Sequence, residues 1–226
     1  MPRRSQEDRS RSTRASLEAA GRELFAERGY AAVSAEEIVA AAGVTRGALH
    51  HHYGDKRGLF IAVLEQLETD NTAEVRSAIA ALPDPSDPTA AMAIGLHTFL
   101  TISRRPETVR IAMSDGPAVL GWPQWRDMES RYGLGLITDQ LERAVEAGLA
   151  PALPVRTLGQ LILAAITEAG MIVAHAQDQD AAGAETEQCV VALLTGLLLP
   201  PTGAPEVVDA DGTPHRTGPD ATQQPM

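Results

Sequence analysis

The sequence predicts an all-α protein in which a small three-helix domain with a helix-turn-helix precedes a larger helical body. Apolar residues recur at helical spacing along most of the chain, and no segment shows the alternation that is typical of a strand. Proline and glycine divide the 226 residues into about nine helices. We expect a flexible basic arm (1–10), the helix-turn-helix domain (11–58), the helical body (59–199) and a disordered tail (200–226).

The first helix is expected over residues 14–28, because Leu17, Leu24 and Phe25 share one face and Gly29 can end it. The arm before this helix is basic, and it could either enter a minor groove of DNA or remain a tail without contacts. Deletion of residues 1–10 would distinguish these alternatives. The arginines in and next to the arm are Arg3, Arg4, Arg9, Arg11 and Arg14.

Two short helices follow, joined by a tight turn at Gly43. Ser34 and Glu37 have the spacing of a capping box at the start of the first of them. Gly43 stands where a helix ends in a left-handed backbone, which glycine adopts without a Cβ penalty. Thr45 can then cap the second helix. The residues expected to form the shared core of the pair are Ile38, Val39, Ala42, Val44, Leu49 and Tyr53.

The flanks of this pair carry further motifs, namely ELFAERGY before it, V-S-x-x-x-I at its start, AAGVTRGALHHH across the turn and Y-x-D-K-x-x-L-F at its exit. In this order, over residues 11–62, they resemble the N-terminal domain of the TetR (TetR/AcrR) family of one-component bacterial transcription regulators. The family often has Tyr where this chain has His50, and Phe where it has Tyr53. The resemblance implies a double-stranded DNA operator as partner.

The second helix of the pair is the expected reader of DNA. Arg46 can donate to a guanine edge, while Gly47 and Ala48 allow a close approach and contact with a thymine methyl group. Thr45, His50 and Lys56 are expected at phosphates, with Ser34 as cap and phosphate ligand and His51 at a base or phosphate. The expected DNA contacts are therefore Ser34, Thr45, Arg46, Gly47, Ala48, His50, His51 and Lys56.

Charge is distributed unevenly along the chain. The net charge is −11, yet residues 1–58 carry ten Lys and Arg against eight Asp and Glu, whereas the rest carries nine against twenty-two. A weakly basic head on an acidic body suits a protein that binds a specific DNA site without coating DNA at random, although both parts could simply be solvated surfaces.

The sequence lacks the residue patterns that other classes of function require. Consecutive histidines at 50–52 point about 100° apart on a helix and cannot converge on one ion, so we expect no metal and no cofactor. No G-x-S-x-G, H-E-x-x-H or Walker loop is present, which argues against an enzyme. Cys189 is expected to be a buried apolar residue. Purely apolar runs are shorter than the ~20 residues of a membrane span, and a cytoplasmic protein without membrane contact is expected.

The body is expected to consist of helices separated by Pro- and Gly-rich breaks. One break is Pro83–Pro88, and a second is a loop over Asp115–Pro123, beside the only two tryptophans, where it could act as a gate. The expected helices cover residues 56–82, 89–103, 108–114, 124–147, 156–177 and 184–199.

The last two helices each carry a broad apolar stripe that ordinary core packing could explain. In the TetR family the corresponding helices pack against a second copy as a four-helix bundle, so the resemblance implies a homodimer with two DNA-reading helices about 34 to 36 Å or more apart. The expected interface residues are Leu161, Ala165, Ala169, Ile172, Val190, Leu193, Leu194 and Leu197.

The resemblance also implies a cavity in the body for an unknown small-molecule effector, which the composition suggests is mostly apolar. The expected lining residues are Met92, Leu96, His97, Leu100, Met113, Trp122, Trp125, Met128, Tyr132, Thr167, Met171 and His175. The alternative is a DNA-binding protein without such an effector, controlled by a protein partner or by its abundance. The resemblance favours repression over activation.

Overall fold

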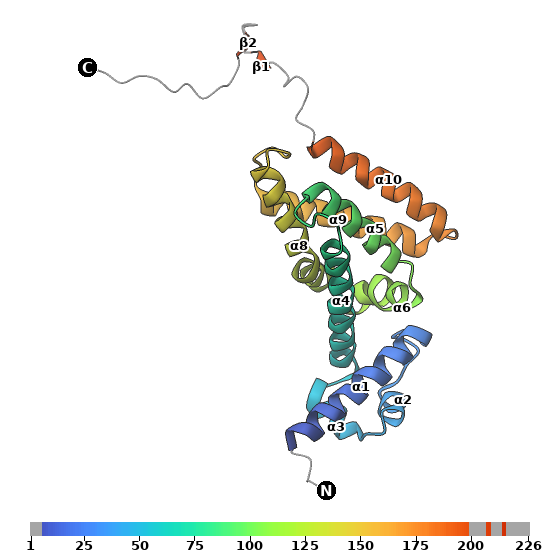
Figure 1. Cartoon of the computed structure of the whole chain (residues 1–226). Coiled ribbons are helices and arrows are strands. Elements are labelled where there is room, and N and C mark those ends of the chain that lie inside the picture. Colours follow the sequence, from blue (N-terminus) through green and yellow to red (C-terminus); the bar gives the residue numbers. More distant parts are fainter. Residues whose placement is uncertain (1–5, 199–206, 209–213, 216–226) are drawn as a thin grey trace, which may run out of the picture.

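The computed structural model describes residues 6–198, 207–208 and 214–215, and the described part is helical except for one short strand pair (Figure 1). Its elements are α1 (Gln6–Arg28), α2 (Ala35–Ala41), α3 (Arg46–Tyr53), α4 (Lys56–Ala80), α5 (Pro88–Ile102), α6 (Pro106–Thr108), the π-helical η1 (Val109–Asp115), α7 (Gly116–Leu120), α8 (Trp122–Glu146), α9 (Val155–His175), α10 (Gln179–Leu198), β1 (Val207–Val208) and β2 (Pro214–His215).

The structure confirms the all-α class and corrects several boundaries. Because α6, η1 and α7 run on without a break, they count as one segment, which gives nine helices in the described residues. The loop expected over 115–123 is wrong, since α7 and the start of α8 occupy it. α1 begins at Gln6, so residues 6–10 of the expected flexible arm are helical.

The tail differs from expectation where it is described. Val207–Val208 pairs with Pro214–His215 as an antiparallel bridge, although no strand was expected. The rest of the expected tail, like residues 1–5 of the arm, lies outside the described residues.

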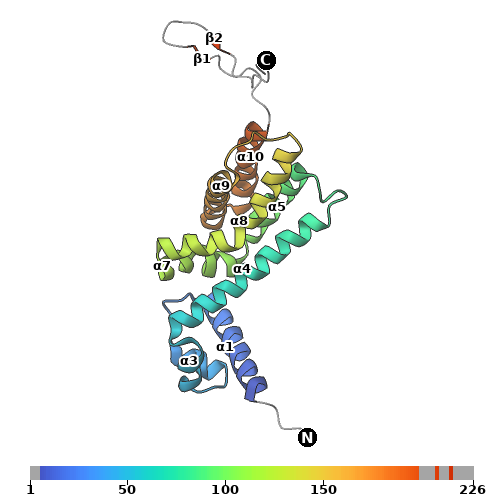
Figure 2. The same ribbon diagram turned by 90° about the vertical axis from the view of Figure 1, so that its left-hand side faces the viewer.

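The head, formed by α1 to α3, shares one core with the adjoining part of the body, which includes α4 and η1. Phe25 of α1 and Phe60 of α4 are fully buried, with ring centroids 5.3 Å apart, and Ile111 of η1 belongs to the same buried cluster. Helix α4 continues from this cluster into the body, so it connects the two parts along its length (Figure 2). The head is therefore packed onto the body by η1 and α4.

A second core holds the upper body together. It includes Leu100 of α5, Leu141 of α8, Val173 of α9 and Val190 of α10, all of them buried. The 21 residues of α9 would be long and apolar enough to cross a membrane by length and composition alone. In the fold, however, α9 packs against α5, α8 and α10, as a core helix does.

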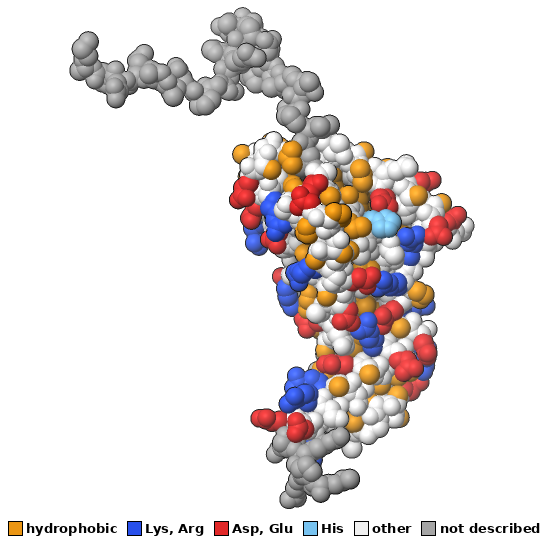
Figure 3. All heavy atoms as spheres, viewed as in Figure 1, with side chains coloured by type: hydrophobic (Ala, Val, Ile, Leu, Met, Phe, Trp, Pro, Cys, Tyr) orange, Lys and Arg blue, Asp and Glu red, His pale blue; other side chains and the backbone are white. Residues whose placement is uncertain are grey.

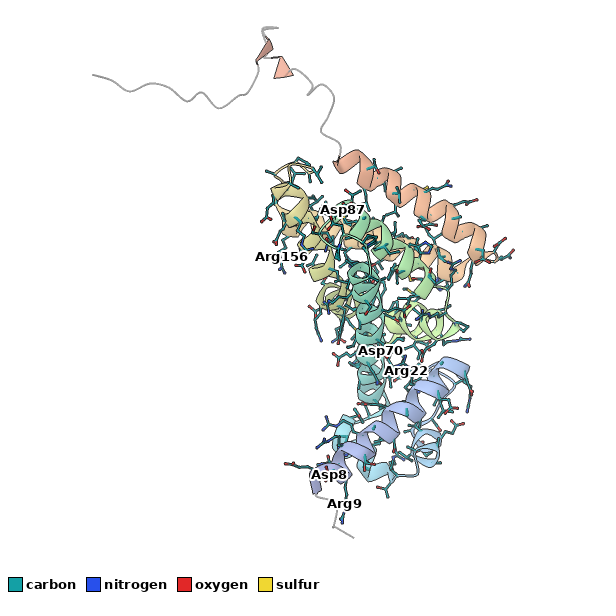
Figure 4. All side chains as sticks on the ribbon, viewed as in Figure 1. Asp8, Arg9, Arg22, Asp70, Asp87 and Arg156 are labelled. Carbon is teal, nitrogen blue, oxygen red and sulfur yellow. The ribbon has the colours of Figure 1, made fainter. Side chains whose placement is uncertain are left out.

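Arg22 of α1 ties the head to the body through two carboxylates. Its Nε and Nη2 donate to Glu107 at 2.6 and 3.0 Å, and its Nη1 donates to Asp70 of α4 at 2.6 Å. Figure 4 shows Arg22 and Asp70 facing each other between α1 and α4. The Arg22 side chain is only 25% exposed, so these charge-assisted bonds are partly shielded from water.

We expect Arg22→Met to lower the free energy of unfolding by about 1 to 2 kcal/mol, because both carboxylates lose their shared donor. Thermal denaturation would measure a Tm decrease of ~2 to 6 °C. Arg131→Met is the matched control, since Arg131 also bonds two carboxylates but is 54% exposed. An equal decrease in the control would contradict a special role for Arg22.

Candidate nucleic-acid interface and ligand cavity

Both short helices of the head are capped as the sequence predicts. The Ser34 hydroxyl accepts from the Glu37 amide at 3.2 Å, and the Glu37 carboxylate accepts from the Ser34 amide at 2.8 Å, which completes the capping box. The backbone and side-chain hydrogen bonds from Ser34, with Arg28, hold the pKa of Glu37 at about 2. Thr45 accepts from the Ala48 amide at 3.3 Å, and Gly43 has a φ of 64°.

Two further contacts fix the direction of α3. The Tyr53 hydroxyl donates to Glu18 of α1 at 2.7 Å. At the other side, the chain turns so sharply that a Cβ added to Gly58 would lie 2.0 Å from the Tyr53 carbonyl oxygen. The α3–α4 corner therefore requires glycine at position 58, and it sets how α3 is presented.

The outer face of α3 is open to solvent in the way a DNA-reading surface requires. Thr45, Arg46, Gly47, His50 and His51 are exposed, and Ala48 is half-buried. The Arg46 side chain is 76% exposed and pairs with Glu36 of α2 at 2.5 Å. A guanine edge would have to compete with Glu36 for this guanidinium.

Two expected phosphate ligands have partners inside the head. The His50 Nδ1 lies 2.6 Å from the Gly54 carbonyl oxygen and closes the end of α3. The Lys56 ammonium donates to the Tyr30 and Val33 carbonyls at 2.9 and 2.8 Å and lies 4.0 Å from the centroid of the Tyr30 ring. Lys56 therefore binds the α1–α2 connection, and only one of its three N–H donors remains.

A groove next to α3 joins the expected contact His51 to arginines in and next to the expected arm. Its charged and titratable lining consists of Arg9, Arg11 and Arg14 of α1, Glu7 and Glu18 of the same helix, and His51 and His52. Burial, His51 and Arg14 lower the pKa of His52, so this histidine carries less positive charge at neutral pH than a solvated histidine would. These arginines belong to or adjoin the basic arm for which the sequence leaves open entry into a minor groove, and contact with DNA stays a prediction.

An apolar cavity of about 130 Å³ lies in the body, bounded by α4, α5, α6, η1, α8, α9 and α10. Its lining includes Phe99 and Ile137 among many aliphatic residues. Of the expected ligand contacts, the structure places the following in its wall: Met92, Leu96, Met113, Trp125 and Thr167.

The other expected contacts lie elsewhere. Trp122 is 65% exposed, the His97 Nδ1 lies 3.1 Å from a Glu187 carboxylate oxygen at the surface, and the His175 Nδ1 lies 2.8 Å from the Met171 carbonyl oxygen. The remaining four belong to or pack against the two cores: Leu100, Met128, Tyr132 and Met171. The expected gate loop is helical, so its tryptophans do not flank an irregular segment.

The cavity wall also contains polar groups that the sequence did not indicate. Burial and Glu129 raise the pKa of Glu68 to about 7. Burial raises the pKa of Glu129 to about 6, against hydrogen bonds from Thr167 and Arg126. Two buried polar atoms in the wall, Thr108 Oγ1 and Gln140 Oε1, have no hydrogen-bond partner in the described residues.

The expected dimer residues divide between two sides of α9 and α10. Leu161, Ile172 and Leu193 are exposed. The apolar residue that directly follows each of them in the sequence is buried in the chain's own core. Cys189 is exposed too, one helical turn before Leu193, so its expected burial is wrong. Ala165 is half-buried, the residues that face the core are Ala169, Val190 and Leu194, and the side chain of Leu197 lies outside the described part.

Comparison with known proteins agrees with this geometry. Residues 17–63 match the model of the bacterial regulatory proteins of the tetR family, and residues 89–197 match that of the tetracyclin repressor-like C-terminal domain. A TetR-family transcriptional regulator from Pectobacterium atrosepticum has a similar structure, with a TM-score of 0.75 and 30% identity over 88% of this chain and all of that one.

Characterised relatives support the same assignment. An HTH-type transcriptional repressor of Mycobacterium tuberculosis is 30% identical over 147 residues, which cover 65% of this chain and 73% of the repressor. The regulator CymR of Pseudomonas putida is 36% identical over 85 residues, 38% of this chain, but the match covers only 42% of CymR. Both domains and the longest of these alignments agree, and the chain belongs to the TetR family of DNA-binding transcriptional regulators.

Proposed function

We propose that the chain acts in the cytoplasm as a homodimeric repressor, which leaves a palindromic operator when a small, mostly apolar ligand occupies the cavity. One observation carries this proposal. Helix α4 starts in the head at Lys56 and lines the cavity further on, from Glu68 to Ile79. A ligand that shifts α4 at the cavity therefore shifts the element on which the DNA-reading helix is mounted.

A second connection between cavity and head supports the coupling. Ala112 and Met113 of η1 line the cavity, and Asp115 at the end of η1 accepts a hydrogen bond from the Tyr30 amide of the head at 2.7 Å. π-helical turns are less stable than α-helical ones and are common at functional sites. Movement of η1 on ligand binding would thus pull on the connection between α1 and α2.

The exposed apolar face of α9 and α10, defined by Leu161, Ile172 and Leu193, supports the dimer. Leu161 is 65% exposed, Leu193 is 67% exposed and Ile172 is 51% exposed, and Val191 of α10 is exposed as well. Figure 3 shows the body from the side on which α5 lies in front of α9, and hydrophobic and charged side chains are mixed on that side. A second copy of the same face would remove these leucines from water.

We expect the double variant Leu161→Glu, Leu193→Glu to be monomeric, because four carboxylates would have to enter one apolar interface. Sedimentation velocity would then give the single-chain mass of 23.9 kDa for the variant and twice that mass for the unmodified chain. Leu149→Glu, an exposed leucine in the connection after α8, is the control and should leave the dimer intact. A dimeric double variant would refute this interface.

We expect Arg46→Ala to weaken binding to the preferred operator by about 1 to 3 kcal/mol and to relax the preference at one base position in each half-site. A binding assay against operators with single base changes would measure both effects. Arg156→Ala, which removes the same charge from the body, is the control. If the base preferences of the Arg46 variant are unchanged, Arg46 does not read a base.

Relatives support the direction of regulation. Several are named repressors, including AcnR of Corynebacterium glutamicum, whereas FasR of Mycolicibacterium smegmatis is named an activator. A solved structure of RolR in complex with resorcinol shares the fold, with a TM-score of 0.63 at 20% identity. The names favour repression for this chain, and the ligand of RolR in that structure is resorcinol.

A further inference from the structure

The ionisable side chains in the cavity wall are all carboxyl groups. Among the residues that line it, Glu68 of α4 and Glu129 of α8 are the ionisable ones, and no Lys, Arg or His shares the lining. Arg126 reaches Glu129 from the same helix, with its Nη1 3.0 Å from a carboxylate oxygen. Glu68 has no hydrogen bond or ion pair within the described part of the chain.

Glu68 is half-buried, and its side chain lines the cavity. A carboxylate in such a place is poorly solvated and is repelled by Glu129. A positive charge inside the cavity would offset both the poor solvation of the Glu68 carboxylate and its repulsion by Glu129. The attraction is strong there because little water separates the charges.

A second, independent feature of the wall points to a hydrogen-bond donor. The Gln140 side chain is 6% exposed, and its Oε1 has no partner among the described residues. Buried side-chain oxygens without a partner are uncommon and costly, so a ligand N–H that reaches Gln140 would recover the missing bond. The Thr108 hydroxyl, 1% exposed and equally unpartnered, offers another polar contact in the same wall.

The cavity volume limits the size of the occupant. At about 130 Å³ it is close to an engineered cavity of ~150 Å³ in another protein that binds benzene. Aliphatic and aromatic side chains supply most of the remaining wall, so they suit one apolar ring.

We propose that the cavity takes a small single-ring amine in its protonated form, with the ammonium beside Glu68 and Glu129 and an N–H donated to the Gln140 side-chain oxygen. This inference rests on the proposed function, in which the same cavity holds the effector, and it adds the chemical class of that effector.

Isothermal titration calorimetry on the full chain without DNA tests the proposed ligand class with three probes, each of which has one benzene ring and one polar group. Benzylamine, benzyl alcohol and benzoate are cationic, neutral and anionic at pH 8, where the ammonium of a primary amine, with a pKa near ~10, remains protonated. We expect benzylamine to bind at least tenfold more tightly than benzyl alcohol, and benzoate at least tenfold more weakly.

Single substitutions in the wall separate the contribution of the Glu68 charge to binding from that of the Gln140 hydrogen bond. Glu68→Gln should weaken benzylamine at least tenfold without changing benzyl alcohol, whereas Glu65→Gln on the outer side of α4 should change neither. Gln140→Leu should weaken benzylamine and benzyl alcohol alike, because both donate a hydrogen bond. Lowering the pH from 8 to 5.5 should weaken benzylamine alone, since the carboxylates become protonated.

The proposal is overturned if benzyl alcohol or benzoate binds as tightly as benzylamine, if none of the three binds, or if Glu68→Gln leaves benzylamine unaffected. Operator binding by the same preparation is measured separately. If the chain binds its operator but none of the probes, the proposed function stands and the ligand class is wrong. If the chain binds benzylamine but no operator, the ligand class stands and the proposed function is wrong.

Discussion

Gly58→Ala is expected to destabilise the head by about 3 kcal/mol or more and to abolish detectable operator binding. The added Cβ would lie 2.0 Å from the Tyr53 carbonyl oxygen, which is backbone and cannot rotate away as a side chain could. Either the end of α3 or the start of α4 must move. Thermal denaturation should show a Tm decrease of roughly 6 to 12 °C, and an operator-binding assay should show the loss of DNA affinity.

Gly135→Ala is the matched control for this change. Gly135 lies inside α8, and outside the backbone of its own helix and its two neighbouring residues nothing lies within 4 Å of the Cβ that alanine would add. Alanine in a helix interior is better than glycine by about 0.5 to 1 kcal/mol, so the control should be slightly stabilised and should bind DNA normally. A stable Gly58→Ala variant with full DNA affinity would show that the α3–α4 corner is not constrained as described.

Glu68→Gln should stabilise the chain at pH 8 and have little effect at pH 5. Burial raises the pKa of Glu68 from 4.5 to about 7, so the folded state binds a proton more tightly than the unfolded state does. The stability contributed by the protonated form is complete below pH 4.5 and is lost as pH rises through about 7. Glutamine stays neutral, which removes a penalty on the order of 3 kcal/mol at pH 8.

Denaturant titration of both chains at pH 5 and pH 8 measures this difference. Glu65→Gln serves as the control, because Glu65 lies three residues earlier on α4 and bonds Arg131 at the surface. The account fails if Glu68→Gln changes stability equally at both pH values, since a buried, titrating carboxyl group would then not be the cause.

Features set by neighbouring residues could be predicted from the sequence. The capping box of Ser34 and Glu37, the glycine turn at Gly43 and the Thr45 cap depend on backbone geometry within four residues, and all three are present. The segment around Pro117 could not be read in this way. Its prolines were interpreted as loop, yet Pro117 and Pro123 occupy first-turn positions of α7 and α8, where proline is tolerated.

Features set by tertiary packing were predicted only in part. The apolar stripes of α9 and α10 were found, but the side of each stripe that meets the chain's own core depends on how the helices are rotated. The sequence alone does not single out Glu68, because a charged residue on a long helix usually faces water. The stripe that joins Leu64 to Val75 and Ile79 at helical spacing contains Glu68 and Thr72, and this polar interruption was the available signal.

Two copies of this chain are expected to read one symmetric DNA site. Selection of bound sequences from a random duplex pool, followed by sedimentation of the chain with the selected duplex, tests it most directly. We expect a palindromic consensus, at least two chains on each duplex, and affinity that falls steeply with salt. A consensus without dyad symmetry, or one chain on each duplex, would contradict it.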